Sequence, residues 1–275
     1  MGLSLLQDRM RGIMIQLQTK FSRQVDEHNV LPEYPRPSLV RTSYLNLNGR
    51  WECAFSKTPE IPLSFDLSIL VPFSPECQLS GVSRQLKPGE YLWYRRTIPL
   101  AKPQQDKRIL LHFGAADQTA EVFVNRISAV RHCGYLPFSA DITDYLQEGD
   151  NELIVRIQDE SNTSWHARGK QSLKPGGMFY TAQTGLWQTV WMEIVPVNYI
   201  EQIFYHTDYD QGLVHLKVLT QHSAPVECVI SGKDMEPVCI NGMTNSELIV
   251  SLPDFHPWTP EDPFLYLVSL KSGVD

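Results

Sequence analysis

The segment 168–193 reads RGKQSLKPGGMFYTAQTGLWQTVWME and decides the fold class. One proline and two consecutive glycines at 175–177 predict a loop, because neither a helix interior nor a central strand tolerates this run. The residues that follow alternate in polarity and are rich in tryptophan, which predicts a strand over 190–195. We therefore expect a loop that leads into a β-strand.

Aromatic rings and cationic side chains gather in this region, and proteins hold sugars with this combination. A flat ring covers the apolar C–H face of a sugar, and the polar groups bond its hydroxyls. The predicted substrate-binding residues are Trp165, Arg168, Lys170, Phe179 and Tyr180. The structural alternative places the cations in a salt-bridged loop and the rings in core or interdomain contacts.

Trp187 and Trp191 have a different expected role. They are four positions apart on what reads as one strand, so their side chains would share a face. Packing in the core is the prediction for both rings.

Short runs of β-branched and aromatic residues, separated by turns, fill the chain from residue 34 onward. This texture predicts an all-β sandwich or jelly roll. The first domain is expected over residues 31–197. Its predicted strands are 51–55, 91–98, 108–113, 120–124, 152–158 and 190–195.

A second, smaller β-sandwich of immunoglobulin type is predicted over residues 198–275. Such a domain needs about seven strands, and this part of the chain supplies five clear ones and a sixth at 237–241. We therefore expect the chain to be part of a longer protein. A missing strand would leave an unpaired edge, which favours association, so a homo-oligomer is one expectation. The five clear strands are 200–205, 213–220, 226–231, 247–252 and 264–270.

Residues 1–30 form an N-terminal extension. Apolar residues recur at helical spacing from Leu6 to Val25, which predicts an amphipathic helix docked on the main domain. A translated leader is an alternative, because Met10 and Met14 could each begin the protein. A transit peptide is disfavoured by the acidic residues of the segment.

Composition excludes several classes of partner. The 42% of hydrophobic and 20% of charged residues indicate a globular protein, and the net charge of −7 argues against nucleic acid or an anionic membrane. No run approaches the roughly 20 apolar residues of a membrane helix. Five cysteines without a C-x-x-C pair predict reduced thiols in a cytoplasmic protein. The histidines have no ligand spacing, so no metal site is expected on them, and no cofactor is expected. A structural Ca²⁺ stays unassigned, because no loop is dense enough in aspartate to predict one.

Several motifs are specific in combination. They are Tyr34-Pro35-Arg36-Pro37, Leu45-Asn46-Leu47-Asn48-Gly49-Arg50-Trp51, Leu92-Trp93-Tyr94-Arg95-Arg96, Val122-Phe123-Val124-Asn125, Gly134-Tyr135-Leu136-Pro137-Phe138 and His256-Pro257-Trp258-Thr259-Pro260-Glu261-Asp262-Pro263. Together they resemble the N-terminal region of family 2 glycoside hydrolases, the β-galactosidase, β-glucuronidase and β-mannosidase group. The segment 168–193 looks like the end of that family's sugar-binding domain.

The resemblance implies a galactose-binding-like jelly roll followed by an immunoglobulin-like domain, in a parent that hydrolyses terminal β-glycosidic bonds. In that family a (β/α)₈ barrel follows and carries both catalytic glutamates, since retaining hydrolysis needs two carboxyls about 5 Å apart. We expect no catalytic residue here, an inactive fragment, and as partners a β-linked carbohydrate and the protein's own barrel. A stand-alone carbohydrate-binding module is the alternative. We assign no acid–base role to Asp117, Asp159 or Glu160, because the sequence does not show a second carboxylate paired with any of them in a cleft.

Two positions depart from the family pattern. Asn125 is followed by Arg126, where the family usually has glycine. A tight hairpin would force a non-glycine residue to positive φ at about 1 kcal/mol, so a longer or differently shaped loop is expected. The acidic residue that better-known members place before the glycine matching Gly185 is absent from residues 177–180.

Overall fold

The computed structural model describes residues 19–100 and 105–275. These residues form two compact units, and the predicted all-β class is confirmed. Unit 1 contains residues 19–35, 44–100 and 109–193. Unit 2 contains residues 36–43, 105–108 and 194–275.

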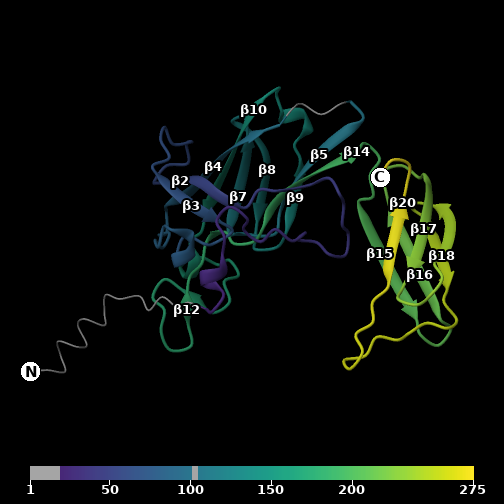
Figure 1. Cartoon of the computed structure of the whole chain (residues 1–275). Coiled ribbons are helices and arrows are strands. Elements are labelled where there is room, and N and C mark those ends of the chain that lie inside the picture. Colours follow the sequence, from purple (N-terminus) through teal and green to yellow (C-terminus); the bar gives the residue numbers. More distant parts are fainter. Residues whose placement is uncertain (1–18, 101–104) are drawn as a thin grey trace, which may run out of the picture. The chain divides into compact units, whose positions relative to one another are not determined.

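Unit 1 is built on two main sheets (Figure 1). Among the described residues, the larger sheet has the order β3–β2–β4–β10–β7–β8, and all neighbours in it are antiparallel. Its strands are β2 (Gly49–Ser56), β3 (Leu67–Val71), β4 (Tyr91–Pro99), β7 (Thr119–Val124), β8 (Ile127–Cys133) and β10 (Asp150–Gln158). The smaller sheet has the order β1–β14–β5–β9. Its strands are β1 (Tyr44–Asn46), β5 (Lys107–Phe113), β9 (Phe138–Asp141) and β14 (Val190–Pro196).

Short elements connect these strands. The pair β6 (Ala116–Asp117) and β13 (Gly185–Leu186) is antiparallel, and the pair β11 (Gln171–Ser172) and β12 (Tyr180–Thr181) is parallel. The short 3-10 helices are η1 (Ser22–Gln24), η2 (Gln78–Ser80), η3 (Thr143–Tyr145) and η4 (Ser161–Thr163).

The core of unit 1 lies between the two main sheets. Leu92 and Tyr94 of β4 are buried there with Leu111 of β5, because alternate residues of a strand point to opposite faces. Trp93 points the other way and is equally buried, packed with Phe65 in a second cluster. Complete burial of a large apolar side chain contributes roughly 1.5–3 kcal/mol, so both faces of β4 stabilise the unit.

The N-terminal segment of the described chain runs along unit 1 without forming an α-helix. Its regular element is η1 (Ser22–Gln24). Val30 is buried, and its carbonyl accepts a hydrogen bond from the Asn48 side-chain amide at 3.2 Å. The amphipathic helix expected within residues 1–30 falls mainly on residues 1–18, which lie outside the described residues.

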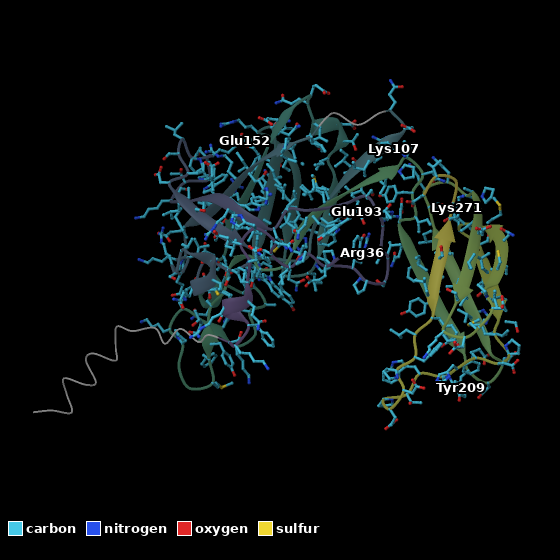
Figure 2. All side chains as sticks on the ribbon, viewed as in Figure 1. Arg36, Lys107, Glu152, Glu193, Tyr209 and Lys271 are labelled. Atoms are coloured by element: carbon cyan, nitrogen blue, oxygen red, sulfur yellow. The ribbon has the colours of Figure 1, made fainter. Side chains whose placement is uncertain are left out.

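A buried carboxylate holds this segment to β14. Glu193, labelled in Figure 2, has its Oε2 3.0 Å from Nε2 of His112 and accepts a hydrogen bond from the Tyr34 hydroxyl. The His112 ring stacks on Trp191 with their centroids 4.8 Å apart. A buried carboxylate is tolerated only when it is paired, so these contacts are structural.

The hairpin between β7 and β8 corrects the expectation of a longer loop. It is a tight two-residue turn in which Asn125 and Arg126 both have positive φ, +50° and +67°. The Asn125 amide donates to Oδ1 of Asn151 at 2.8 Å, and Arg126 Nε lies 3.1 Å from Oε2 of Glu152. These bonds offset the cost of the backbone conformation, which asparagine tolerates better than most residues.

Unit 2 is a sandwich of two sheets (Figure 1). Among the described residues, the strand orders are β15–β16–β19 and β18–β17–β20. The strands are β15 (Gln202–Asp208), β16 (Leu213–Leu219), β17 (Pro225–Ser231), β18 (Val238–Met243), β19 (Glu247–Ser251) and β20 (Leu267–Lys271). Val218 of one sheet and Cys228 of the other are fully buried in the shared core.

One close approach of backbone to side chain sets the position of β13 in unit 1. The Leu186 N–H donates to the Tyr94 hydroxyl at 3.2 Å. Gly185 has φ +83°, and a Cβ there would overlap that hydroxyl and lie 3.1 Å from Cδ2 of Leu92. Only glycine fits this position without displacing the core.

We predict that Gly185→Ala destabilises unit 1 by about 2–4 kcal/mol, because core overlap adds to the strain of a positive φ. Urea unfolding followed by tryptophan fluorescence measures this loss. Gly89→Ala is the matched control, since Gly89 also has positive φ (+75°) but a Cβ there would meet nothing within 4 Å. The control is expected to lose about 1 kcal/mol. Equal losses at both positions would contradict a role for the Tyr94 contact.

Candidate functional site

A cavity of about 290 Å³ lies on unit 1. Its size is near the lower end of small-molecule sites, which start at roughly 300 Å³. Two rings, one carboxylate, one guanidinium and two amides contribute to its lining. The residues are Asp117, Tyr135, Arg168, Gln171, Gln183 and Trp187. We call it the unit 1 cavity. Apolar surface with a few convergent polar groups is typical of a ligand site.

The close packing of β13 brings separate parts of the chain to this cavity. Antiparallel pairing of β6 with β13 sets Asp117 opposite Gly185. The backbone N–H of Gln183, just before β13, donates to Oε1 of Gln171 at 2.5 Å. The fit of Gly185 against Tyr94 therefore positions the carboxylate and both amides.

A long loop around β12 supplies the cationic side of the cavity (Figure 1). The Gln171 N–H donates to the Arg168 carbonyl at 3.1 Å, and Gly169 provides the positive φ of +57° that this turn contains. The Tyr180 N–H donates to the Lys170 carbonyl at 2.9 Å. Backbone bonds thus hold the loop that carries Arg168.

Asp117 is the buried acceptor of the cavity. The Gln171 amide donates to its Oδ2 at 3.4 Å. Burial raises the pKa of Asp117 to about 6, the charge of Asp159 acts in the same direction, and the Gln171 hydrogen bond opposes both. At neutral pH the carboxylate is therefore mostly ionised and can accept hydrogen bonds from sugar hydroxyls.

Arg168 lines the same cavity and has a donor without a partner. Its Nε is buried and has no hydrogen-bond partner among the described residues. A buried donor left unsatisfied costs about 1–3 kcal/mol, so the guanidinium of Arg168 has hydrogen-bonding capacity that the described residues do not use. The lining of the cavity thus contains a carboxylate, which accepts hydrogen bonds, and a guanidinium, which donates them.

Trp187 lines the cavity, and the prediction that it packs in the core is wrong. Its side chain is 37% exposed, and it lies in the connection between β13 and β14. Because β14 begins at Val190, the two tryptophans are not on one strand and the shared-face argument does not apply. Trp191 lies on β14 and is 5% exposed, so the core prediction is confirmed for that ring.

Of the five predicted substrate-binding residues, Arg168 lines the cavity. The structure places the other four outside its lining, all of them exposed: Trp165, Lys170, Phe179 and Tyr180. The Trp165 ring is 87% exposed and packs on the neighbouring His166 with their centroids 4.3 Å apart. The three rings therefore do not belong to the core of unit 1.

Sequence reasoning missed the residues that complete the cavity. Asp117 was set aside because no partner in a cleft could be named, and Tyr135, Gln171 and Gln183 carried no signal of their own. Their proximity arises from strand pairing across more than 60 positions of the chain. The closeness of Gln171 to Arg168 was the one local signal available.

Other kinds of site find no support in the described part of the chain. Within residues 19–100 and 105–275, no group of three or more His, Cys, Asp or Glu side chains is placed to hold a metal ion. No helix in those same ranges is long and apolar enough to cross a membrane.

Comparison with known families decides what this domain is. Residues 82–182, which include Asp117, Tyr135, Arg168 and Gln171, match the family model described as glycosyl hydrolases family 2, sugar binding domain. Residues 82–182 are a family 2 sugar-binding domain. The resemblance to family 2 that the motifs predicted is confirmed.

Curated relatives of this sugar-binding domain are glycosidases. A β-galactosidase of Thermoanaerobacter pseudethanolicus is 27% identical over 196 residues, which cover 65% of this chain and 25% of the relative. A β-glucuronidase of Rattus norvegicus is 29% identical over 209 residues, 66% of this chain and 32% of the relative. The chain therefore spans about a third or less of the length of these relatives.

Solved structures support the fold beyond the sugar-binding domain. A β-glucuronidase of Faecalibacterium prausnitzii superposes with a TM-score of 0.65 at 23% identity, covering 88% of this chain and 46% of that one. A family 2 member of Bacteroides cellulosilyticus gives 0.62 at 19% identity, covering 84% and 34%. At this level of identity the likeness concerns the fold, a β-sandwich region of family 2 enzymes.

A second buried carboxylate supports the segment that carries Gln183 and Trp187. Glu76 accepts hydrogen bonds from the Thr184 hydroxyl at 2.9 Å and from its backbone N–H at 3.2 Å. Burial raises the pKa of Glu76 to about 7, although these hydrogen bonds act in the opposite direction. Its proton is therefore held more tightly in the folded protein than in the unfolded chain.

We predict that unit 1 loses stability as pH rises from about 4.5, the ordinary pKa of glutamate, to about 7. The folded state binds more protons than the unfolded chain in this window, so the free energy of unfolding falls with rising pH. Urea unfolding across pH 4–8 should show a flatter profile for Glu76→Gln, because the amide cannot titrate. Glu33→Gln, at an exposed carboxylate of unit 1, should keep the wild-type profile. An unchanged profile in Glu76→Gln would contradict the assignment.

We predict that sugar binding to the unit 1 cavity weakens as pH falls through about 6, because protonation removes the negative charge that makes Asp117 a strong acceptor. Titration calorimetry with methyl β-galactoside from pH 5 to 8 measures this loss. Asp117→Asn should bind weakly with no dependence on pH in this range. Asp159→Asn should shift the loss to lower pH, because it removes a charge that raises the Asp117 pKa. If the pH midpoint of sugar binding were the same in the wild type, in Asp117→Asn and in Asp159→Asn, Asp117 would be ruled out as the acceptor.

Proposed function

We propose that this chain is the non-catalytic N-terminal region of a family 2 glycosidase that hydrolyses terminal β-glycosidic bonds. In this proposal the sugar-binding domain supports a separate catalytic barrel and contributes Arg168 and the unit 1 cavity to holding the substrate. The match to the family 2 sugar-binding domain and the glycosidase activities named for the relatives support it.

The observation that carries the proposal is the single carboxylate of the unit 1 cavity. Asp117 is the one carboxylate in its lining among the described residues. Retaining hydrolysis needs two carboxyls about 5 Å apart at the scissile bond. Asp159 acts on the Asp117 pKa, but it is buried and does not line the cavity. The arrangement can therefore hold a sugar but lacks the second group that cleavage requires.

The relatives include a β-galactosidase and a β-glucuronidase, so galactosides and glucuronides are the two candidate ligands. Arg168 suits either, because a guanidinium donates to neutral hydroxyls and bonds a carboxylate in a bidentate manner. Asp117 in the same lining favours a ligand that places hydroxyls, rather than a second negative charge, near this carboxylate.

A stand-alone carbohydrate-binding module is the second candidate. The exposure of Trp165, Phe179 and Tyr180 favours it, since such modules bind sugars on exposed rings. This candidate requires measurable sugar affinity at those rings in the 275-residue chain itself. Cytoplasmic location and self-association are further proposals that rest on the sequence expectations alone.

We predict that the purified 275-residue chain does not hydrolyse a panel of aryl β-galactosides, β-glucuronides and β-mannosides. The longer protein that contains it should be active, and Arg168→Ala in that protein should raise KM about tenfold, the effect of losing one charge-assisted hydrogen bond. Lys174→Ala, an exposed cation of the same loop outside the cavity, is the control and should leave KM unchanged.

Two outcomes would contradict this proposal. Turnover by the pure 275-residue chain, free of contaminating glycosidase, would show that catalysis resides here. An unchanged KM in Arg168→Ala would favour a purely structural role for the domain.

A further inference from the structure

A second cavity, of about 510 Å³, lies at one end of unit 2. We call it the unit 2 cavity. It is formed by the turn between β17 and β18 and by the segment 252–266, which joins β19 to β20. That segment is the loop in yellow tones in Figure 1, at the end of the unit where Figure 2 labels Tyr209. The unit 2 cavity is larger than the unit 1 cavity, and all of its lining residues belong to unit 2.

Rings form the apolar wall of the unit 2 cavity. Phe264 packs on His256 with ring centroids 4.6 Å apart and meets Tyr266 edge to face at 5.0 Å. Phe255 contributes a further ring and is held edge to face by Tyr209 at 5.0 Å. The wall is thus a set of mutually packed rings, the kind of surface on which the C–H face of a sugar stacks.

The loop that carries these rings is braced by its own hydrogen bonds. The Tyr266 hydroxyl accepts from the His256 backbone N–H at 2.6 Å and donates to the His256 carbonyl at 3.3 Å. His256 Nε2 lies 2.8 Å from Oδ2 of Asp262, and the Thr259 N–H donates to the Asp262 carbonyl at 3.0 Å. The site is therefore formed before any ligand arrives, which lowers the cost of binding.

Three charged side chains of the lining have no partner side chain among the described residues. Lys233, Asp234 and Asp254 line the cavity. In the ranges that the structure describes, no other side chain makes a hydrogen bond or an ion pair with any of these three. One donor and two acceptors therefore face the cavity together with its rings.

The charge of the lining restricts the class of ligand. Three carboxylates, Asp234, Asp254 and Asp262, stand against the single ammonium of Lys233. This excess of negative charge repels an acidic sugar, whereas a neutral ring can donate hydroxyls to the carboxylates and accept from the ammonium.

We propose that the unit 2 cavity is a second carbohydrate site that binds a neutral sugar and discriminates against uronic acids. It lies outside the matched sugar-binding domain, and sugar binding there does not require the function proposed for the unit 1 cavity. A matched pair of probes tests it: methyl β-D-galactopyranoside and the corresponding 6-carboxylate, methyl β-D-galactopyranosiduronate.

Binding of both probes is measured by saturation-transfer NMR on the 275-residue chain, with Trp187→Ala introduced to disable the unit 1 cavity. We expect the neutral glycoside to bind and the uronate to bind about tenfold more weakly. Asp254→Asn combined with Lys233→Ala should weaken neutral binding about tenfold, because a charged acceptor is replaced by a neutral amide and a charged donor is lost. Glu227→Gln, an exposed carboxylate on β17 outside the cavity, is the charge control and should change nothing.

Each remaining outcome is informative. Loss of all binding on Trp187→Ala alone would overturn the unit 2 site and leave the unit 1 proposal standing. The unit 2 site would also be overturned if the glycoside still bound in Trp187→Ala and its affinity did not change on adding Asp254→Asn and Lys233→Ala. Retained binding in Trp187→Ala that falls with the unit 2 changes would support it, even if the unit 1 cavity proved not to bind sugar.

Discussion

The contact between the Tyr94 hydroxyl and the backbone at Gly185 joins the core of unit 1 to its cavity. Tyr94 is fully buried between the two main sheets, and its hydroxyl accepts the Leu186 N–H at 3.2 Å. A side chain at position 185 would displace that ring, so β13 can approach Tyr94 this closely only because residue 185 is glycine. Because β13 pairs with β6, the same contact positions Asp117, and with it the acceptor of the cavity.

Buried carboxylates in unit 1 show how surroundings decide the role of one chemical group. Glu193 is paired with His112 and Tyr34 and serves to hold strands together. Glu76 is bonded to Thr184, and burial raises its pKa to about 7, so it links stability to pH. Asp117 has one weak amide contact and lines a cavity, which leaves its lone pairs available to a ligand. A carboxylate whose oxygens accept hydrogen bonds from protein donors has a structural role, whereas one with few such donors can bind a ligand.

The two cavities differ in the charge that they present. The lining of the unit 1 cavity has one guanidinium and one carboxylate, so neutral and acidic sugars are both compatible. In the unit 2 cavity three carboxylates stand against one ammonium. Both have rings for apolar contact, and the contrast in charge is therefore what would let the two units prefer different sugars.

The sequence by itself determined the all-β class, the long strands and the family. Strands such as 91–98 and 152–158 were predicted because alternation of polarity is a local property of the chain. The strands β1, β3, β8 and β9 were missed, because they are short or lack clear alternation and are stabilised by their neighbours in the sheet. Arg168 was predicted from its loop, but its partners in the cavity were not.

Only the tertiary structure decided which residues meet. Trp187 does not share a strand with Trp191, because β13 ends before Trp187 and β14 begins after it. Asp117 lines the cavity because β6 pairs with β13, a segment almost 70 residues away in the chain. The tight Asn125-Arg126 turn formed although no glycine is present, because Asn151 and Glu152 bond its side chains. Local pattern thus determined what each segment becomes, since it reports which face of a strand is buried. The site depends on long-range pairing and close packing, which no local pattern encodes.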